Sequence, residues 1–163
     1  MKTDTAAETS YLGLLNAITL AERNAGVYLR AWAAATTDPE LRHALDLVAA
    51  RETTHGEVFR QRIERLGHAV REDEDPELAE RVRVYGDPGV SDLEKIQAAR
   101  RRNPPAKAEA FFASIDERAN DESVDTLTRD TLRWFVHEER DSRALLLAVY
   151  DRIDREGATA TRS

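Results

Sequence analysis

The sequence predicts an all-α protein, in which four long helices form a bundle of two helical hairpins. Apolar residues recur at alternating steps of three and four along four long segments, which is the period of an amphipathic helix. Only seven glycines and five prolines interrupt the chain, and no segment alternates as a strand does. The length of 163 residues suits one domain, which we expect over 9–155, with 1–8 and 156–163 as flexible tails.

The first hairpin is predicted from its apolar stripes and its turn. We expect the first helix from about Thr9 to Ala35. Asp38 is then a candidate N-cap and Pro39 a first helical residue, because the first turn of a helix does not need the N–H that proline lacks. The second helix should end at Gly67, a residue type that commonly closes helices.

The second hairpin follows a long connection, 68–104, which is the least regular part of the chain. Within it we expect a short helix in "REDEDPELAERVRVYGDPGVSD" and another in "SDLEKIQAARRR", capped by Ser91 or Asp92. The third main helix should begin near Pro105 and break at "NDES", and the fourth should run to about Arg155. Such a crossover would place the second and third main helices side by side along the bundle.

Composition and charge exclude several function classes. A net charge of −7 argues against nucleic acid and anionic membrane as partners and favours the collection of cations. The absence of cysteine excludes disulfides, thiolate metal sites and cysteine nucleophiles. Asp4 and Glu8 stand where a secretory signal would need basic residues, and no apolar run approaches the length of a membrane span. We therefore expect a soluble, cytoplasmic protein.

The two predicted hairpins repeat each other when the sequence is shifted by 87 residues. Apolar positions of the second helix then fall on apolar positions of the fourth, such as Leu45 on Leu132. The polar positions follow the same shift, which pairs Glu22 with Glu109, Glu52 with Glu139 and His55 with Ser142. Within each hairpin, the two glutamates lie at equal distances from the turn. At a rise of 1.5 Å per residue this distance is roughly 22 Å, so all four carboxylates should lie at one level of the bundle.

The four glutamates and His55 make a candidate metal site. Glu22, Glu52 and Glu139 each replace an apolar residue on an apolar stripe, and a buried charged carboxylate is strongly destabilising unless it is neutralised. Protonation, arginine partners or a divalent metal could neutralise these groups. Since Glu52 and His55 stand three residues apart, they share a helix face. Carboxylates with one imidazole suit iron or manganese, with zinc as an alternative.

These residues resemble those of the ferritin-like di-iron carboxylate proteins, which include rubrerythrins and encapsulated ferritins. The matching segments are "AERNAGVY" with Glu22, "TTDPELRHALDLVAARETTH" with Glu52 and His55, "AEAFF" with Glu109 and "VHEERDSRALL" with Glu139. The resemblance implies a ferritin-like four-helix bundle in which these five residues hold two iron ions. It also implies an iron-dependent oxidoreductase or ferroxidase-like activity with oxygen or peroxide, and it is compatible with a homo-oligomer.

The sequence departs from that family in three ways. Ser142 replaces a second histidine, so one metal position should be weak or empty unless water, Glu138 or Asp141 substitutes. No four-cysteine module follows, and the only methionine is Met1, so neither a complete rubrerythrin nor haem ligation by methionine is expected. The alternative function is a degenerate, metal-poor bundle that acts as a binding or scaffold protein.

Overall fold

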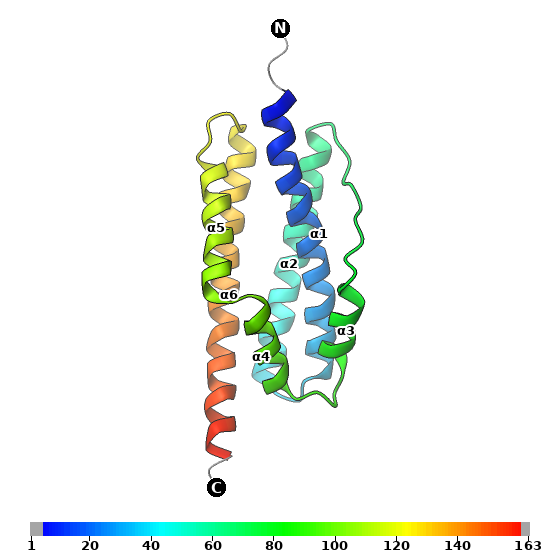
Figure 1. Ribbon diagram of the computed structural model, residues 1–163, viewed down its shortest axis with the longest axis vertical. Helices are drawn as coiled ribbons and strands as arrows, with labels where there is room; N and C mark the ends of the chain where they lie inside the picture. The colour runs from blue at the N-terminus through cyan, green and yellow to red at the C-terminus, as the bar shows by residue number, and fades with distance from the viewer. Residues whose placement is uncertain (1–4, 161–163) are drawn as a thin grey trace.

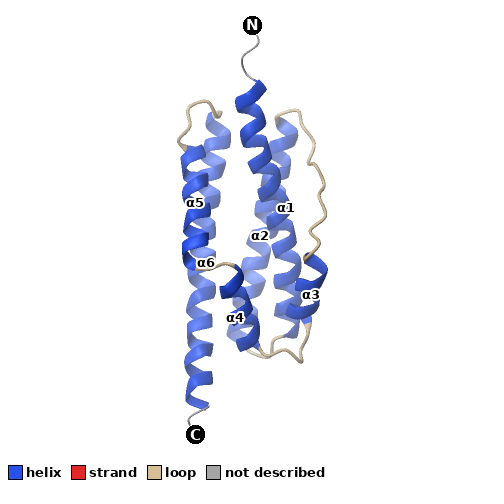
Figure 2. Ribbon diagram, viewed as in Figure 1, coloured by secondary structure: helices blue, strands red, loops and turns tan. Residues whose placement is uncertain are grey.

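The chain is helical over most of the residues that the structure describes. The computed structural model describes the backbone of residues 5–160 and the side chains of residues 11–160. Its helices, in chain order, are α1 (Thr5–Ala35), α2 (Pro39–Arg65), α3 (Leu78–Gly86), α4 (Asp92–Arg102), α5 (Pro105–Ala119) and α6 (Thr126–Ala160) (Figures 1 and 2). The described residues contain no strand, and none of their helices is long and apolar enough to cross a membrane. The predicted all-α class is confirmed.

The predicted turn between α1 and α2 is confirmed in detail. The Asp38 side chain accepts a hydrogen bond of 2.8 Å from the Leu41 N–H, and Pro39 is the first residue of α2. After the end of α2, Gly67 has a φ of 83°, a left-handed conformation that side chains other than glycine rarely adopt. These two signals set the ends of α2. The turn at Asp38 places α2 beside α1, and the two helices pack against each other.

The connection between α2 and α5 contains the two short helices that the sequence predicts. Ser91 is the N-cap of α4, since its hydroxyl accepts from the Glu94 N–H while the Glu94 side chain accepts from the Ser91 N–H. This capping box settles the choice between Ser91 and Asp92. In Figure 1, α3 lies beside the lower part of α1, and α4 lies in front of the lower end of α2, beside α6. The expectation that the second and third main helices lie side by side is wrong, because α2 packs against α6 and not against α5.

The boundaries at the two ends of the chain differ from the prediction. The first helix already includes Thr5, ahead of the predicted start at Thr9, and α6 continues past Arg155 to Ala160. Part of each segment expected as a flexible tail is therefore helical, while residues 1–4 and 161–163 lie outside the described residues. The predicted start of α5 at Pro105 is confirmed.

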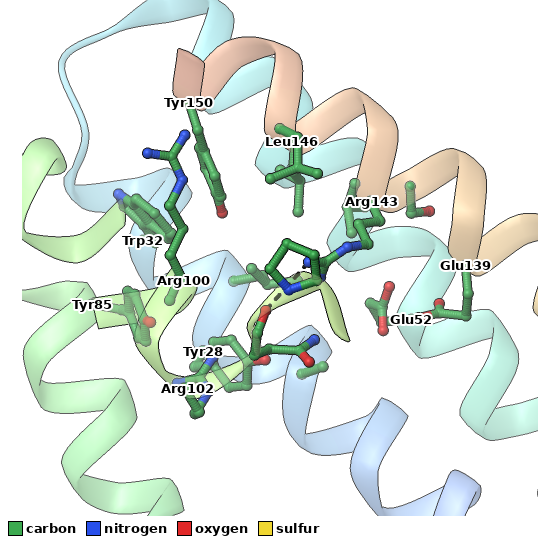
Figure 3. Close-up of a pocket in the computed structure, with 18 of the residues that line it drawn as sticks. Tyr28, Trp32, Glu52, Tyr85, Arg100, Arg102, Glu139, Arg143, Leu146 and Tyr150 are labelled. Atoms are coloured by element: carbon green, nitrogen blue, oxygen red, sulfur yellow. Dashed lines mark hydrogen bonds between the residues drawn. The ribbon is translucent and has the colours of Figure 1, made fainter. Parts of the chain in front are cut away.

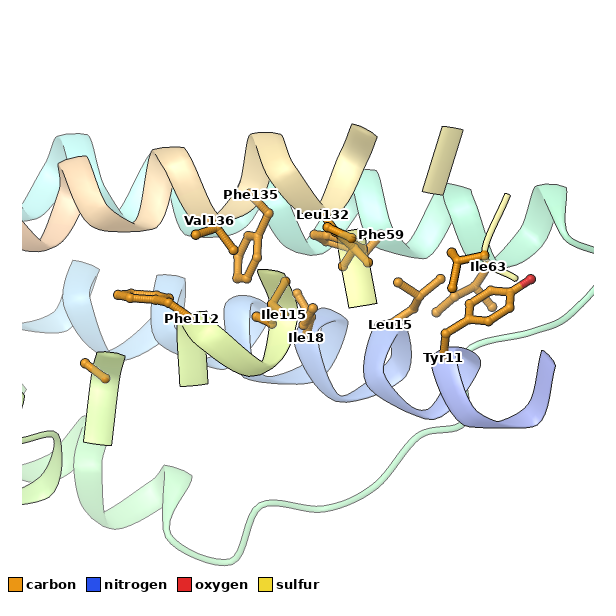
Figure 4. Close-up of a cluster of buried hydrophobic side chains, with 13 residues drawn as sticks. Tyr11, Leu15, Ile18, Phe59, Ile63, Phe112, Ile115, Leu132, Phe135 and Val136 are labelled. Carbon is orange, nitrogen blue, oxygen red and sulfur yellow. The ribbon is translucent and has the colours of Figure 1, made fainter. Parts of the chain in front are cut away.

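Two buried apolar clusters fill the space between the helices, and a polar layer separates them. The first cluster includes Leu15, Phe59, Ile115 and Phe135 from α1, α2, α5 and α6 (Figure 4). The second is built around Trp32, Leu45, Tyr85, Ile96 and Tyr150. On α1, α2 and α6, the residues between the clusters include Glu22, Glu52, His55 and Glu139. The polar layer therefore divides the apolar core into two clusters.

The buried side chains of the first cluster should contribute strongly to the stability of the fold. Replacing the fully buried Phe59 by alanine should lower the free energy of unfolding by about 3–5 kcal/mol, because the lost contacts leave a cavity. The control is Phe111→Ala on α5, where the side chain is 42% exposed and the change should stay within about 1 kcal/mol. Urea unfolding followed by circular dichroism at the helical band measures both. Equal losses for the two variants would contradict this description of the core.

Candidate metal centre

Four of the five predicted ligand residues meet in the polar layer. Glu22 comes from α1, Glu52 and His55 from α2 and Glu139 from α6. Each offers one ligand atom, and these four atoms all lie within 4.8 Å of one another. Glu22, Glu52 and His55 are buried, and the Glu139 side chain is 17% exposed. The three-residue step from Glu52 to His55 places both side chains on the same face of α2, as the sequence predicts.

A close approach of α1 and α2 brings Glu22 to the α2 ligands. A Cβ atom added at Gly56 would lie 3.2 Å from the Arg23 backbone nitrogen and 3.3 Å from the Thr19 carbonyl oxygen. A Cβ atom at Gly26 would lie 2.6 Å from Thr53 Oγ1 and 3.3 Å from the Ala49 carbonyl oxygen. Glycine at these two positions therefore lets the two backbones approach directly beside the polar layer.

His55 faces the carboxylates through one of its two ring nitrogens. Its Nδ1 atom lies 3.2 Å from Glu22 Oε2 and 3.2 Å from Glu139 Oε1. The ring packs edge-on against Trp134 and Phe135, with centroid distances of 5.0 and 5.2 Å. Its Nε2 atom is buried and has no hydrogen-bond partner. The aromatic neighbours therefore hold the imidazole with Nδ1 turned toward Glu22 and Glu139.

The buried glutamates are protonated more readily than ordinary carboxylates. Burial raises the pKa of Glu22 to about 8, and the charge of Glu139 adds to this effect, whereas a hydrogen bond with Glu52 opposes it. Burial also raises the pKa of Glu52 well above its usual range, and the charges of Glu22 and Glu139 raise it further. Within residues 11–160, no arginine or lysine forms an ion pair with any of these three glutamates. Protons or a bound cation must therefore neutralise the layer.

Glu109 does not belong to this layer, so the prediction that all five residues converge is wrong. Its side chain is 65% exposed and accepts a 2.9 Å hydrogen bond from Arg140, which also binds Asp116. The buried face of α5 instead carries Ala108, Phe112, Ile115 and Ala119. Because successive helical residues are about 100° apart, the inward direction of Ala108 turns Glu109 toward solvent.

Ser142 is buried beside the layer, but an arginine occupies its surroundings. Arg51 Nη1 donates to Ser142 Oγ at 3.2 Å and to Asp141 Oδ2 at 2.6 Å, and Arg51 also lies 3.8 Å from Glu138. The two carboxylates considered as substitute ligands are therefore paired with Arg51. With Glu109 on the surface and a guanidinium group at Ser142, the described residues supply donors for one cation near His55 and not for a second.

A cavity of about 250 Å³, which the sequence does not predict, opens beside Glu52, Glu139 and Ser142 (Figure 3). Side chains from α1, α2, α3, α4, α5 and α6 line it, including Trp32 and Tyr150. The sequence indicates that these two aromatic residues lie on core stripes. No local pattern shows that a space remains between them and the glutamates, because the short helices of the connection complete its wall.

The raised pKa values predict how the metal-free protein responds to pH. When a carboxyl group has a higher pKa in the folded state than in the unfolded state, the protein loses stability as the pH rises. The loss begins near the unfolded-state pKa of 4.5 and continues through the folded-state pKa. The metal-free protein should therefore melt at a lower temperature at pH 8 than at pH 5. Glu52→Gln removes one buried charge, so it should raise the melting temperature at pH 8 and flatten the pH dependence.

Differential scanning calorimetry in chelator measures both effects, with Glu109→Gln as the exposed control that should leave the pH dependence unchanged. A lower melting temperature for Glu52→Gln at pH 8 would show instead that the charged carboxylate is held by a structural partner.

Comparison of the chain with protein-family models, with curated proteins and with solved structures finds no match. Support for a metal centre therefore comes from the four convergent side chains.

Proposed function

We propose that the chain is a ferritin-like metal-binding protein that holds one divalent transition-metal ion between Glu22, Glu52, His55 and Glu139. The observation that carries the proposal is the convergence of their four ligand atoms in a layer that forms no ion pair with an arginine or lysine of the described chain. Burial of several carboxylates is unfavourable unless they are neutralised, and a divalent cation is the neutralising group that these donors fit best.

The donor set favours iron or manganese, with zinc as an alternative. Three carboxylates supply hard oxygen ligands and one imidazole supplies a borderline nitrogen. One oxygen of Glu139, Oε1, is buried and accepts no hydrogen bond from the described residues, and its one close polar contact among them is His55 Nδ1 at 3.2 Å. An unpaired buried carboxylate oxygen is unfavourable in a protein interior, and coordination of a cation would remove that penalty. This oxygen therefore adds to the support that the spacing of the four residues gives.

The arrangement of helices supports a ferritin-like fold. We infer that α1, α2, α5 and α6 form the four helices of the bundle, with α3 and α4 in the crossover between its hairpins. In ferritin-like proteins such a crossover joins two hairpins, and inward-facing carboxylates and histidines of the bundle bind metal. Iron in this position would supply electron exchange with oxygen or peroxide. The protein would contribute the donors, the exclusion of solvent and the orientation of His55 by Trp134 and Phe135.

The second candidate function is a metal-free bundle that acts as a binding or scaffold protein. The exposed position of Glu109 and the contact between Arg51 and Ser142 favour it, because both remove ligands that a two-metal centre would use. Retention of four convergent donors favours the metal-binding function. Metal titration separates the two.

The protein should bind one metal ion per chain. Isothermal titration with Mn²⁺, and with Fe²⁺ under argon, should give a stoichiometry of one, and the bound ion should raise the melting temperature because it binds only the folded arrangement. His55→Ala and Glu22→Gln should each weaken binding at least about tenfold, since each removes a direct ligand. Glu109→Gln is the control and should bind like the wild type. Two equally tight sites, or none, would contradict the proposal.

The iron-loaded protein should oxidise Fe²⁺ faster than protein-free buffer does. Carboxylate ligands stabilise Fe³⁺ more than Fe²⁺, so mixing the anaerobic Fe²⁺ protein with air or peroxide should give a rapid rise in ferric absorbance. Glu52→Ala combined with His55→Ala should abolish the excess rate. The control is Glu109→Ala combined with His137→Ala, which removes the same residue types from the surface. An excess rate that survives the first double substitution would assign the oxidation to surface-bound iron.

A further inference from the structure

The cavity beside the polar layer has two ends of different chemistry. Glu52 and Glu139 line one end, while Trp32, Tyr85 and Tyr150 line the other (Figure 3). Arg143 and Leu146 lie between these two ends in the same view. The space therefore gives access to the carboxylates of the candidate metal centre and is too large for a single water molecule, which needs about 30 Å³.

Aromatic rings form the wall farthest from the glutamates. Trp32 stacks on Tyr85 with a centroid distance of 4.9 Å and on Tyr150 with a distance of 5.7 Å. The indole N–H of Trp32 donates to Asp92 at 2.7 Å, so this polar group is already satisfied outside the cavity. What the wall offers a ligand is flat, largely apolar surface, against which another aromatic ring packs well.

Two arginines on the cavity wall have no acidic partner. The guanidinium group of Arg102 lies over the rings of Tyr28 and Tyr85, at 5.0 and 5.4 Å, and Arg143 donates only to the Asn103 carbonyl oxygen at 3.3 Å. Within residues 11–160, neither forms an ion pair with a carboxylate, although the chain has an excess of acidic residues. Arg100, which also lines the cavity, pairs with Asp151 and Asp154.

We propose that this cavity binds a small aromatic carboxylate, which is the substrate class of the proposed metal centre. The ring would pack against Tyr150 and Leu146, and the carboxylate would bind Arg102 and Arg143, whose planar donors match its two oxygens. The role of the ligand as a substrate rests on the proposed function. Its chemical class rests on the cavity alone.

The volume limits the size of the ligand. A cavity of 150 Å³ holds benzene, so 250 Å³ corresponds to about ten non-hydrogen atoms, which is one ring with a short acidic chain. The charges set its direction, because Glu52 and Glu139 repel an anion at their end of the cavity. The acid group therefore belongs at the arginines, and the ring lies toward the aromatic wall. A cation bound among the glutamates would remove that repulsion, so metal and ligand should strengthen each other's binding.

The test measures binding of benzoate, phenylacetate and 3-phenylpropionate by isothermal titration, with and without Mn²⁺. At least one acid should bind with a stoichiometry of one, and at least about tenfold more tightly than its neutral alcohol, as expected for a charge-assisted hydrogen bond. Butyrate, which lacks the ring, should bind at least about tenfold more weakly. Mn²⁺ should increase the affinity for the acid.

Arg143→Gln and Arg102→Gln should each lower the affinity at least about tenfold. Arg101→Gln is the matched control, because Arg101 is exposed on the same helix end and does not line the cavity. Since Arg102 also packs on two tyrosines, Arg102→Lys tests its charge in a variant that keeps a cation there. It should retain more affinity for the acid than Arg102→Gln, and circular dichroism confirms that each variant is folded.

Several results would overturn the inference: no binding of any of the three acids, equal binding of acid and alcohol, or affinity unchanged in both the Arg143→Gln and Arg102→Gln variants. Metal binding without aromatic acid binding would remove this inference and leave the proposed function intact. Arginine-dependent acid binding in a protein that binds no metal would support the assignment of the pocket and remove the proposed function.

Discussion

The burial of three carboxylates in one layer is the constraint on which the rest of this structure depends. Glu22, Glu52 and Glu139 repel one another when charged, and no arginine or lysine in the described chain forms an ion pair with them. The two apolar clusters on either side must therefore supply the stability that this layer removes. The division of the core into two clusters, the raised pKa values of Glu22 and Glu52 and the fit to a cation all follow from that burial.

The sequence predicts the part of the site that interrupts a regular pattern. Glu22, Glu52 and Glu139 are visible because each stands at an apolar position of a long helical stripe, and His55 is visible because it shares the Glu52 face. The turn at Asp38 and Pro39 is predictable for a similar reason, since its cap is local. Where a helix is long and its stripe is continuous, the direction of each side chain follows from its position in the sequence.

The sequence does not predict the features that depend on contacts between distant segments. The repeat of the two hairpins relates Glu22 to Glu109, but α5 is much shorter than α1, and its inward face is set by Ala108 and Phe112. An error of one residue turns a side chain by about 100°, which is enough to move a ligand to the surface. The contact of Arg51 with Ser142 joins residues 91 positions apart, and the cavity requires the placement of α3 and α4. Neither has a local signal.

The glycines at positions 26 and 56 divide the four donors into a rigid group and an adjustable one. Glu22, Glu52 and His55 belong to two helices that approach closely at these glycines, so main-chain packing fixes the separation of the backbone positions that carry them. Glu139 comes from α6 and is the least buried of the four donors. Ions of different radius would therefore be accommodated mainly by movement of the Glu139 carboxylate. Discrimination between ions by size would depend on how freely that one side chain can move, while the backbone that carries the other three donors stays in place.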